Sequence, residues 1–222
     1  MNRFAPTMRD SRATSAFISC WNLRDRQHQL DAAEAALATM PAAPGLVRFS
    51  ILRGLEDDTL LVLAQWTDAD ARDGYLADTH IPRDTVDARV PGIQRLWRVT
   101  ATPHRVVSGP AIAQEPGCFV LIRQPLTAAE PEEQRTWIHA EIAALTATAS
   151  QGVIATTFYA TDDGSPALAL AEWTSEEAHR TATSARAIAP SDVTEPREGG
   201  SDPLDPPTGR RYAFIGAVGA ER

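Results

Sequence analysis

Residues Leu60–Ala71 read LLVLAQWTDADA, and residues Ala167–Ala178 read ALALAEWTSEEA. Placing Trp66 on Trp173 gives an offset of 173 − 66 = 107 residues. The same offset, without a gap, also aligns identical residues at Gly45 and Gly152, Leu61 and Leu168, Leu63 and Leu170, Ala64 and Ala171, Thr67 and Thr174, and Ala71 and Ala178. This agreement at a single offset indicates that one unit of roughly 100 residues occurs twice in the chain.

Each copy of the stretch has the pattern of a strand that leads directly into a helix. Side chains alternate between the two faces of a strand, so every second residue shares a face. One face of the first copy carries Leu60, Val62, Ala64 and Trp66, and the other carries Leu61, Leu63 and Gln65. After the tryptophan, Thr67-x-x-Asp70 and Thr174-x-x-Glu177 have the spacing of a helix-capping box. Because both strand faces are mostly apolar, we expect both to be covered.

The remaining chain predicts the element order βαββαβ in each copy. In the first copy we expect strands at 17–22, 46–53, 60–66 and 94–101, an Ala-rich helix that follows Asp25 and reaches Met40, and a second helix at 68–78. In the second copy we expect strands at 118–123, 153–160, 167–173 and 211–218, and helices at 127–149 and up to about residue 186. A βαββαβ unit is a ferredoxin-like layer with one bare sheet face. The sequence therefore predicts an α+β fold in which two tandem ferredoxin-like units bury these faces against each other as an internal, pseudo-dimeric α+β barrel.

The expected domain boundaries follow from composition. Residues 1–14 lack periodicity and are predicted to be a flexible tail. The first domain is expected at 15–102 and the second at 117–220, here called the first half and the second half. Residues 103–116 contain three prolines and are predicted to be the linker. Residues 187–209 contain five prolines and are predicted to be an insert, either a lid or a partly disordered segment.

Charge and composition exclude several classes of function. The formal net charge is −8, and no basic run is present, so nucleic acid and anionic membranes are not expected partners. The N-terminus lacks the pattern of a signal peptide and no apolar run approaches the ~20 residues that span a bilayer, so we predict a cytoplasmic protein. Cys20 and Cys118 lack the spacing of a zinc site, which favours buried free thiols.

The chain also lacks the short motifs that usually hold cofactors or activate nucleophiles. It contains no Gly-rich phosphate loop, no nucleophile elbow and no His, Asp and Glu set with metal-ligand spacing. We therefore predict that the protein needs no metal, flavin or haem cofactor.

The sequences Leu-Ala-Gln-Trp-Thr at 63–67 and Leu-Ala-Glu-Trp-Thr at 170–174, each on the third strand of a βαββαβ unit, resemble the antibiotic biosynthesis monooxygenase family. That family belongs to the dimeric α+β barrel superfamily, and the resemblance covers nearly the whole chain in tandem. Members of the superfamily include cofactor-free oxygenases that convert aromatic polyketide phenols or anthrones to quinones, haem-degrading oxygenases, and proteins with isomerase or signalling roles.

The resemblance implies a site between the sheet and the helices of each unit. It commonly uses the strand-end tryptophan with an asparagine near the end of the first strand, which here implies Trp66 with Asn22, and Trp173 with Gln124. Other quinone-forming members place asparagine four residues before the tryptophan and tyrosine six after it. At these positions this chain has Val62 and Arg72, or Ala169 and His179. Haem-degrading members have a histidine about ten residues after the tryptophan, whereas His80 follows Trp66 by 80 − 66 = 14.

These positions supply the candidate site residues. Asn22, Trp66 and His80 are the candidate catalytic residues, because an amide can stabilise an oxyanion and a histidine can act as a general base. The candidate substrate-binding residues are Arg72, Tyr75, Gln124, Trp173 and His179. Each has a structural alternative. The tryptophans and Tyr75 are also typical core residues, the amides and His80 are also typical of solvated positions, and His179 has the spacing of a surface pair with Glu176.

Side-chain volume and polar groups point to different halves. Ala167, Ala169 and Ala171 occupy the tryptophan face of the second-half strand, where the first half has Leu60, Val62 and Ala64. A ligand-sized cavity should therefore form more easily in the second half. The amide of Asn22 and the imidazole of His80 both belong to the first half. We place the active site in the first half, because a cavity without a proton acceptor or an anion-stabilising amide cannot catalyse.

The sequence leaves three functions open. The first is a cofactor-independent monooxygenase that acts on a polycyclic aromatic metabolite with molecular oxygen, either forming a quinone or carrying out a related proton transfer. The second is a non-catalytic protein of the same fold that binds a small molecule or has a structural role. The third is a haem-degrading oxygenase. In each case we expect either a monomer with an internal pseudo-dimer or a homodimer of such chains.

Overall fold

The computed structural model describes residues 6–40, 42–77, 80–126, 130–148, 150–164, 166–188 and 209–219. The strands are β1 (Ser15–Asn22), β2 (Leu46–Gly54), β3 (Thr59–Trp66), β4 (Gln94–Ser108), β5 (Cys118–Gln124), β6 (Val153–Thr161), β7 (Ala167–Trp173) and β8 (Arg210–Val218). The helices are α1 (Arg26–Thr39), α2 (Ala69–Ala77), α3 (His80–Arg89), α4 (Pro131–Ala147) and α5 (Glu176–Ile188). Residues 189–208, most of the predicted proline-rich insert, lie outside the described residues.

The order of elements follows the predicted βαββαβ pattern twice, with one helix added. Asp25 precedes α1 as predicted and caps it, because its carboxylate accepts a hydrogen bond of 2.8 Å from the backbone N–H of His28. The additional helix α3 lies between α2 and β4, where the sequence predicted no helix, and it contains Pro82. Proline is tolerated in the first turn of a helix, where its missing N–H has no intrahelical partner. Pro82 therefore does not prevent α3 from forming.

Within the described residues, eight strands form one closed antiparallel barrel in the order β1-β3-β2-β8-β5-β7-β6-β4. The strand β4 closes one seam, because residues 94–101 pair with β1 and residues 101–108 pair with β6. The strand β8 closes the other seam by pairing with both β2 and β5. Each of the eight strands therefore pairs with a neighbour on both sides, although β8 meets β5 only through residues 210–212.

The predicted fold class, two tandem ferredoxin-like units stacked through their bare faces, is therefore wrong. The alternation of apolar side chains shows which strand faces are buried, but it does not show which strand edges pair. Here the fourth strand of each predicted unit bridges to the other unit, so the two sheets are one. The strand β4 also continues through residues 103–108, the start of the predicted linker. The division into two domains stays a prediction.

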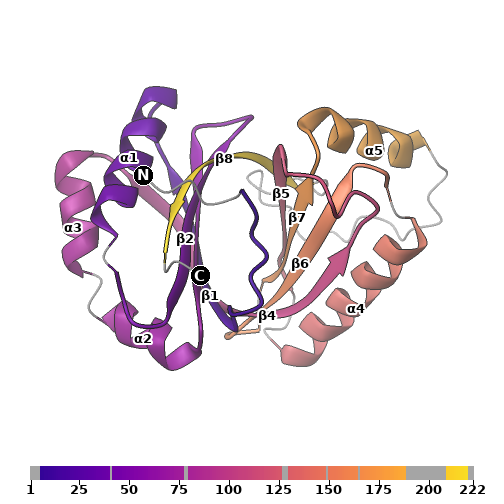
Figure 1. Ribbon diagram of the computed structural model, residues 1–222, viewed down its shortest axis with the longest axis horizontal. Helices are drawn as coiled ribbons and strands as arrows, with labels where there is room; N and C mark the ends of the chain where they lie inside the picture. Colours follow the sequence, from indigo (N-terminus) through magenta and orange to yellow (C-terminus); the bar gives the residue numbers. More distant parts are fainter. Residues whose placement is uncertain are drawn as a thin grey trace.

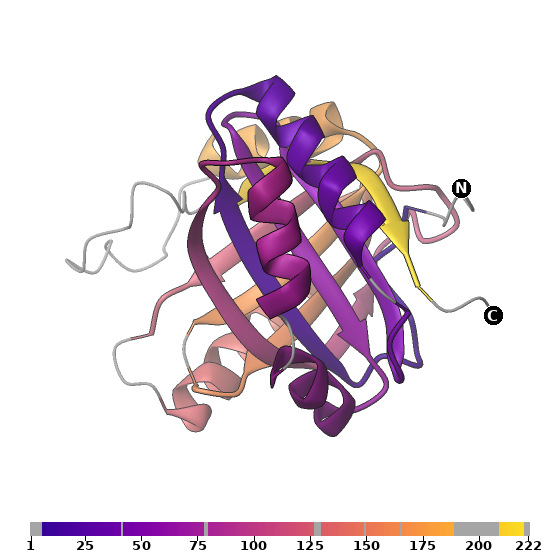
Figure 2. The same ribbon diagram turned by 90° about the vertical axis from the view of Figure 1, so that its left-hand side faces the viewer.

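The helices cover the outside of the barrel on two opposite sides. Helices α1, α2 and α3 lie over the first-half strands, and α4 and α5 lie over the second-half strands (Figure 1). Figure 2 shows α1 and α3 crossing the first-half strands from outside. The face of β3 that carries Leu60, Val62, Ala64 and Trp66 packs in this outer layer with residues of α1, while Leu61 and Leu63 belong to a different cluster inside the barrel. The predicted alternation along β3 is confirmed.

The barrel interior is filled by apolar side chains from both halves and by the N-terminal segment. Leu63 and Leu170 pack there with Met8, of which only 1% is exposed. The Met8 backbone lies between two residues related by the repeat, since 65 + 107 = 172. Its N–H donates to the Glu172 carboxylate at 2.7 Å, and its carbonyl accepts from the Gln65 amide at 2.9 Å. Residues 6–14, expected as part of a flexible tail, are thus held in the fold.

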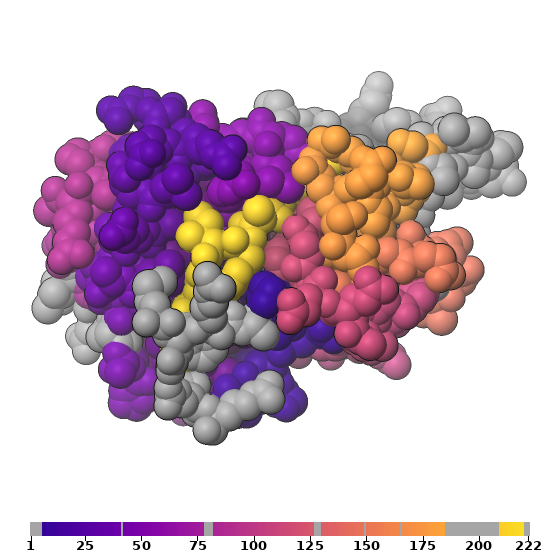
Figure 3. Space-filling model, turned by 45° about the horizontal axis from the view of Figure 1, so that its top comes forward, coloured from indigo at the N-terminus to yellow at the C-terminus, as the bar shows by residue number. Residues whose placement is uncertain are grey.

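Ion pairs connect the two halves at the seam that β8 closes. Figure 3 shows β8, in yellow, between the first-half surface and α5. Arg210 pairs with Asp57 and Arg211 pairs with Glu56, both in the turn between β2 and β3. These contacts join the last strand of the chain to the first repeat.

The two cysteines are buried and form no disulfide with each other, as the sequence indicated. Burial raises the pKa of the Cys118 thiol to about 11. At neutral pH this thiol therefore stays protonated and acts as a small apolar side chain.

Candidate functional site

Each half contains a cavity between the outer face of the barrel and its helices. The first-half cavity has a volume of about 330 Å³ and lies between β1, β3 and β4 and the three helices α1 to α3. The second-half cavity has a volume of about 770 Å³ and lies between β5, β6 and β7 and the helices α4 and α5. Both volumes fall in the usual range of ligand sites. The larger cavity is in the second half, where Ala169 and Ala171 line it, so the volume expected from these alanines is confirmed.

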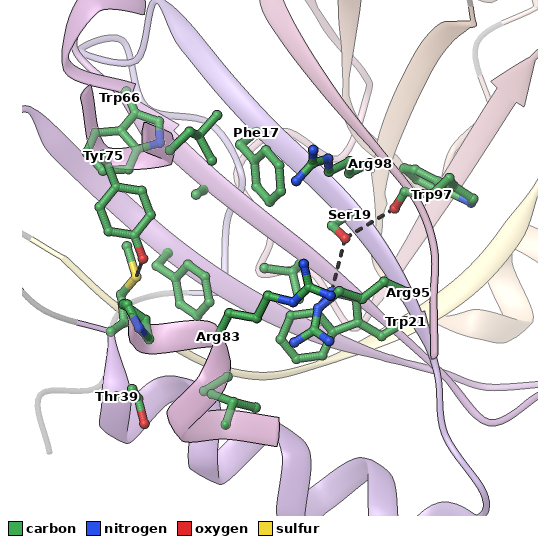
Figure 4. Close-up of a pocket in the computed structure, with 18 residues that line it drawn as sticks. Phe17, Ser19, Trp21, Thr39, Trp66, Tyr75, Arg83, Arg95, Trp97 and Arg98 are labelled. Atoms are coloured by element: carbon green, nitrogen blue, oxygen red, sulfur yellow. Dashed lines mark hydrogen bonds between the residues drawn. The ribbon is translucent and has the colours of Figure 1, made fainter. Parts of the chain in front are cut away.

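Aromatic side chains form one end of the first cavity. Trp66 is fully buried, and its ring lies 5.0 Å from the ring of Tyr75 on α2 (Figure 4). The Tyr75 hydroxyl donates to the Met40 sulfur at 3.1 Å. Burial raises the pKa of Tyr75, so it remains a neutral phenol at neutral pH. Tyr75 and Trp66 therefore form an apolar wall without a charged group.

Arginines and Trp21 form the opposite end of this cavity. Arg95 makes a two-pronged ion pair with Asp87 of α3, at 3.0 and 2.8 Å, and its guanidinium lies 5.0 Å from the centre of the Trp21 ring. The Trp21 indole N–H donates to Ser19 at 3.0 Å, and the Ser19 hydroxyl donates to the carbonyl of Trp97 (Figure 4). Asp87 thus fixes the position of the Arg95 side chain, and Ser19 fixes that of Trp21.

The two strand-end tryptophans share an unusual feature. The indole N–H of Trp66 and that of Trp173 are both buried, and neither has a hydrogen-bond partner among the described residues. A buried donor without an acceptor costs free energy, so such groups are rare in folded proteins. Each tryptophan lines the cavity of its own half. A ligand oxygen in either cavity could accept the missing hydrogen bond.

The second cavity brings a histidine to its tryptophan. His179 on α5 is only 5% exposed, and its ring meets the Trp173 ring edge-on with 5.0 Å between centres. Both residues line the cavity, together with Gln124 at the end of β5. The opposite wall includes Trp137 of α4, whose ring lies 6.4 Å from that of Phe158. This cavity therefore combines apolar walls with an imidazole that can take or give a proton.

The first-half candidates are not brought together in this way. The strands β1 and β3 are antiparallel, and Ser15 pairs with Trp66 whereas Asn22 pairs with Thr59. Asn22 therefore lies at the opposite end of the strands from Trp66, and its amide donates weakly to Gln94 at 3.4 Å. His80 is the first residue of α3, and its side chain lies outside the described residues.

The contacts of Arg72 connect elements of the fold and do not face the first cavity. It is 4% exposed, and its guanidinium donates to Ser15 at 2.9 Å and pairs with Asp73 at 2.8 Å. It also pairs at 2.9 Å with Asp162, in the turn between β6 and β7. Arg72 thus joins α2 to β1 and to the second half, and it is not among the residues that line the first cavity.

Several cavity residues were not identified from the sequence. They are Thr39 and Arg83 in the first cavity, and Trp137, Glu141 and Thr156 in the second. The signal for Trp137 was present, because Trp137, Glu141 and Leu145 are spaced four residues apart on one face of a helix. Arg83 gave no comparable signal, because it belongs to a helix that was not predicted.

The described residues do not meet the requirements of a metal site or of a membrane-spanning helix. Among the described residues, no three His, Cys, Asp or Glu side chains lie close enough together to hold a metal ion. None of the helices in the described part of the chain is both long enough and apolar enough to cross a membrane.

No protein-family model and no curated protein matches this chain. Solved structures do share its fold. An anthrone oxidase-like protein matches with a TM-score of 0.66 at 12% identity, over 93% of this chain and 93% of that one. A candidate monooxygenase from Fusobacterium nucleatum matches with a TM-score of 0.52 at 10% identity, over 78% and 81% of the two chains. A candidate chlorite dismutase matches at 0.50 and 11%, over 91% and 95%. At such low identities the likeness establishes the fold alone.

Proposed function

We propose that the second-half cavity is the active site of an oxygenase that oxidises a phenolic polycyclic aromatic compound, such as an anthrone, without a bound cofactor. The observation that carries the proposal is His179, a buried imidazole set against Trp173 in a cavity of about 770 Å³. A buried imidazole in an apolar cavity is well suited to act as a general base. The proposal includes membership of the antibiotic biosynthesis monooxygenase family.

The first step is removal of a proton from the phenolic form of the anthrone by His179. The resulting anion shares its charge between the phenolic oxygen and a ring carbon. The indole N–H of Trp173, which lacks a partner among the described residues, donates to this oxygen. A donor already fixed in an apolar cavity stabilises the developing charge more strongly than water does, because it need not reorient.

The second step is oxidation of the carbon that shares the charge. The anion passes one electron to molecular oxygen, and the resulting radical and superoxide combine to form a carbon–oxygen bond. His179 first returns its proton to the terminal oxygen of the peroxide anion. The remaining hydrogen of that carbon then passes to His179 as a proton while the oxygen–oxygen bond breaks and hydroxide leaves. The carbon becomes a carbonyl, and the hydroxide takes the proton from His179 to form water. The substrate thus supplies all four electrons, and CH₂ + O₂ becomes C=O + H₂O.

The choice of substrate rests on shape and on the shared fold. The cavity walls include Trp137, Phe158 and Trp173, which suit a flat ring system. The anthrone oxidase-like protein has the same fold over most of both chains, which makes an anthrone the first compound to test. A non-catalytic binding protein would need the same cavity, and only turnover separates these two functions.

Oxygen uptake with dithranol, a phenolic anthrone, tests the proposal. We expect the purified protein, without added metal or flavin, to consume oxygen faster than the spontaneous reaction and to form one quinone for each oxygen molecule consumed. Binding of dithranol without any increase in oxygen uptake would leave a binding protein as the better description.

A further inference from the structure

We propose that the first-half cavity is a separate binding site for a small aromatic carboxylate. This inference goes beyond the proposed function, because it concerns the other cavity and does not require oxygenation there. It follows from three features of the cavity: its charge, its aromatic walls and its polar atoms without partners.

The charge of the first cavity is positive. Among the described residues that line it, Arg83, Arg95 and Arg98 are charged and none is acidic. Asp87 is the one carboxylate that meets these arginines within the described part of the chain, pairing closely with Arg95 and at 3.7 Å with Arg83. Three guanidiniums and one carboxylate leave a net charge of two positive units. An anion is therefore favoured here, although the protein as a whole is negative.

Arg98 is the arginine available to a ligand. The described residues offer it no hydrogen-bond or ion-pair partner, and it lies exposed at the edge of the cavity. Figure 4 shows its side chain directed toward Phe17, on the cavity side of the barrel. Its position on β4 is fixed by pairing with Ser19 of β1. A planar guanidinium can bind both oxygens of a carboxylate at once.

The remaining walls suit a flat ring. Phe17, Trp21, Phe49 and Trp66 all line the cavity, and aromatic side chains bind aromatic ligands by offset or edge-on stacking. The volume of about 330 Å³ is less than half that of the second cavity, which restricts the ligand to a small ring system.

Two buried polar atoms in this cavity have no partner among the described residues, the Thr39 hydroxyl and the Trp66 indole N–H. Both residues line the cavity, and they come from α1 and β3, respectively. Each can donate a hydrogen bond to a ligand oxygen, so a ligand with oxygen substituents would satisfy groups that the fold leaves unsatisfied.

The second cavity differs from the first in charge. Its described lining includes Glu141 and His179 but no arginine. The repeat therefore has two cavities at matching places with different electrostatics. We infer that the first half takes an anion that the second half would not bind.

The test compares two probes that differ mainly in charge, naphthoate and its neutral amide, naphthamide. We expect naphthoate to bind the full chain about tenfold more tightly or better, and we expect Arg98→Gln to abolish this preference. Arg105→Gln is the matched control, because Arg105 is also an exposed arginine of β4 but does not line the cavity, and it should keep the wild-type preference.

Thr39→Val provides a second variant that keeps all the arginines and should weaken naphthoate binding several-fold. Equal affinity for the two probes, or a preference that survives Arg98→Gln, would overturn the proposal. Loss of naphthoate binding in Trp173→Phe instead of Arg98→Gln would place the probe in the second cavity and would also overturn it. Dithranol turnover is not a readout here, so this result and that of the oxygen-uptake test are independent.

Discussion

Replacing His179 by alanine is expected to lower kcat for dithranol oxidation by about 10²- to 10⁴-fold, the usual contribution of a general base. His179 is the imidazole that lines the second cavity and contacts Trp173, so its loss removes the proton acceptor from the proposed site. Oxygen-electrode rates at saturating dithranol, with quinone formation followed by absorbance, measure the effect.

Two additional measurements separate proton transfer from simple packing. Added imidazole should partly restore the rate of His179→Ala, because it can occupy the space that the side chain leaves. His139→Ala is the matched control, since His139 also lies on a second-half helix but is exposed and outside the cavity lining. If the two alanine variants turn over dithranol equally fast, His179 is not the base.

Met8→Ala is expected to lower the free energy of unfolding by about 2–5 kcal/mol, the usual cost of truncating a buried methionine. Met8 is 1% exposed and packs with interior residues of both halves. Its backbone is fixed by Gln65 and Glu172, and Arg9 adds an ion pair of 2.9 Å to the same carboxylate. Because these contacts fix the backbone, the segment cannot shift to fill the cavity that the shorter alanine side chain would leave.

Urea unfolding of the purified variants measures this effect. Arg12→Ala is the control in the same segment, because Arg12 forms an exposed pair with Asp10, and such pairs contribute little to stability. Unfolding midpoints that coincide for Met8→Ala, Arg12→Ala and the wild type would show that the N-terminal segment does not belong to the barrel core.

Local features of the fold could be predicted from the sequence, whereas its closure could not. The alternation along residues 60–66 correctly assigned side chains to the two faces of β3, and Asp25 correctly marked the start of α1. The pairing of β4 with β6 and of β8 with β5 depends on which strand edges meet, and side-chain periodicity does not report this. Within residues 6–14, Met8 and Ala13 are the buried apolar residues, which is too little pattern to predict that the segment enters the barrel.

The candidate site was predicted in part for similar reasons. Trp66 and Trp173 were found because the repeat aligns them, and the larger second cavity followed from the alanines of β7. Asn22 was grouped with Trp66, although the antiparallel register separates them by the length of β1. For His179 the alternative to substrate binding was a surface pair with Glu176, but Glu176 pairs with Arg180 one turn later and His179 turns toward Trp173. The orientation of His179 depends on the direction in which the first turn of α5 leaves β7. The spacing of residues in the sequence does not specify that direction.

The location of bound product tests the central claim most directly. A crystal structure of the full chain with dihydroxyanthraquinone, the quinone that dithranol yields, should place the rings in the second-half cavity, with an oxygen within hydrogen-bond distance of the Trp173 indole N–H and near His179. Quinone bound in the first-half cavity against Trp66, with none in the second, would contradict the assignment.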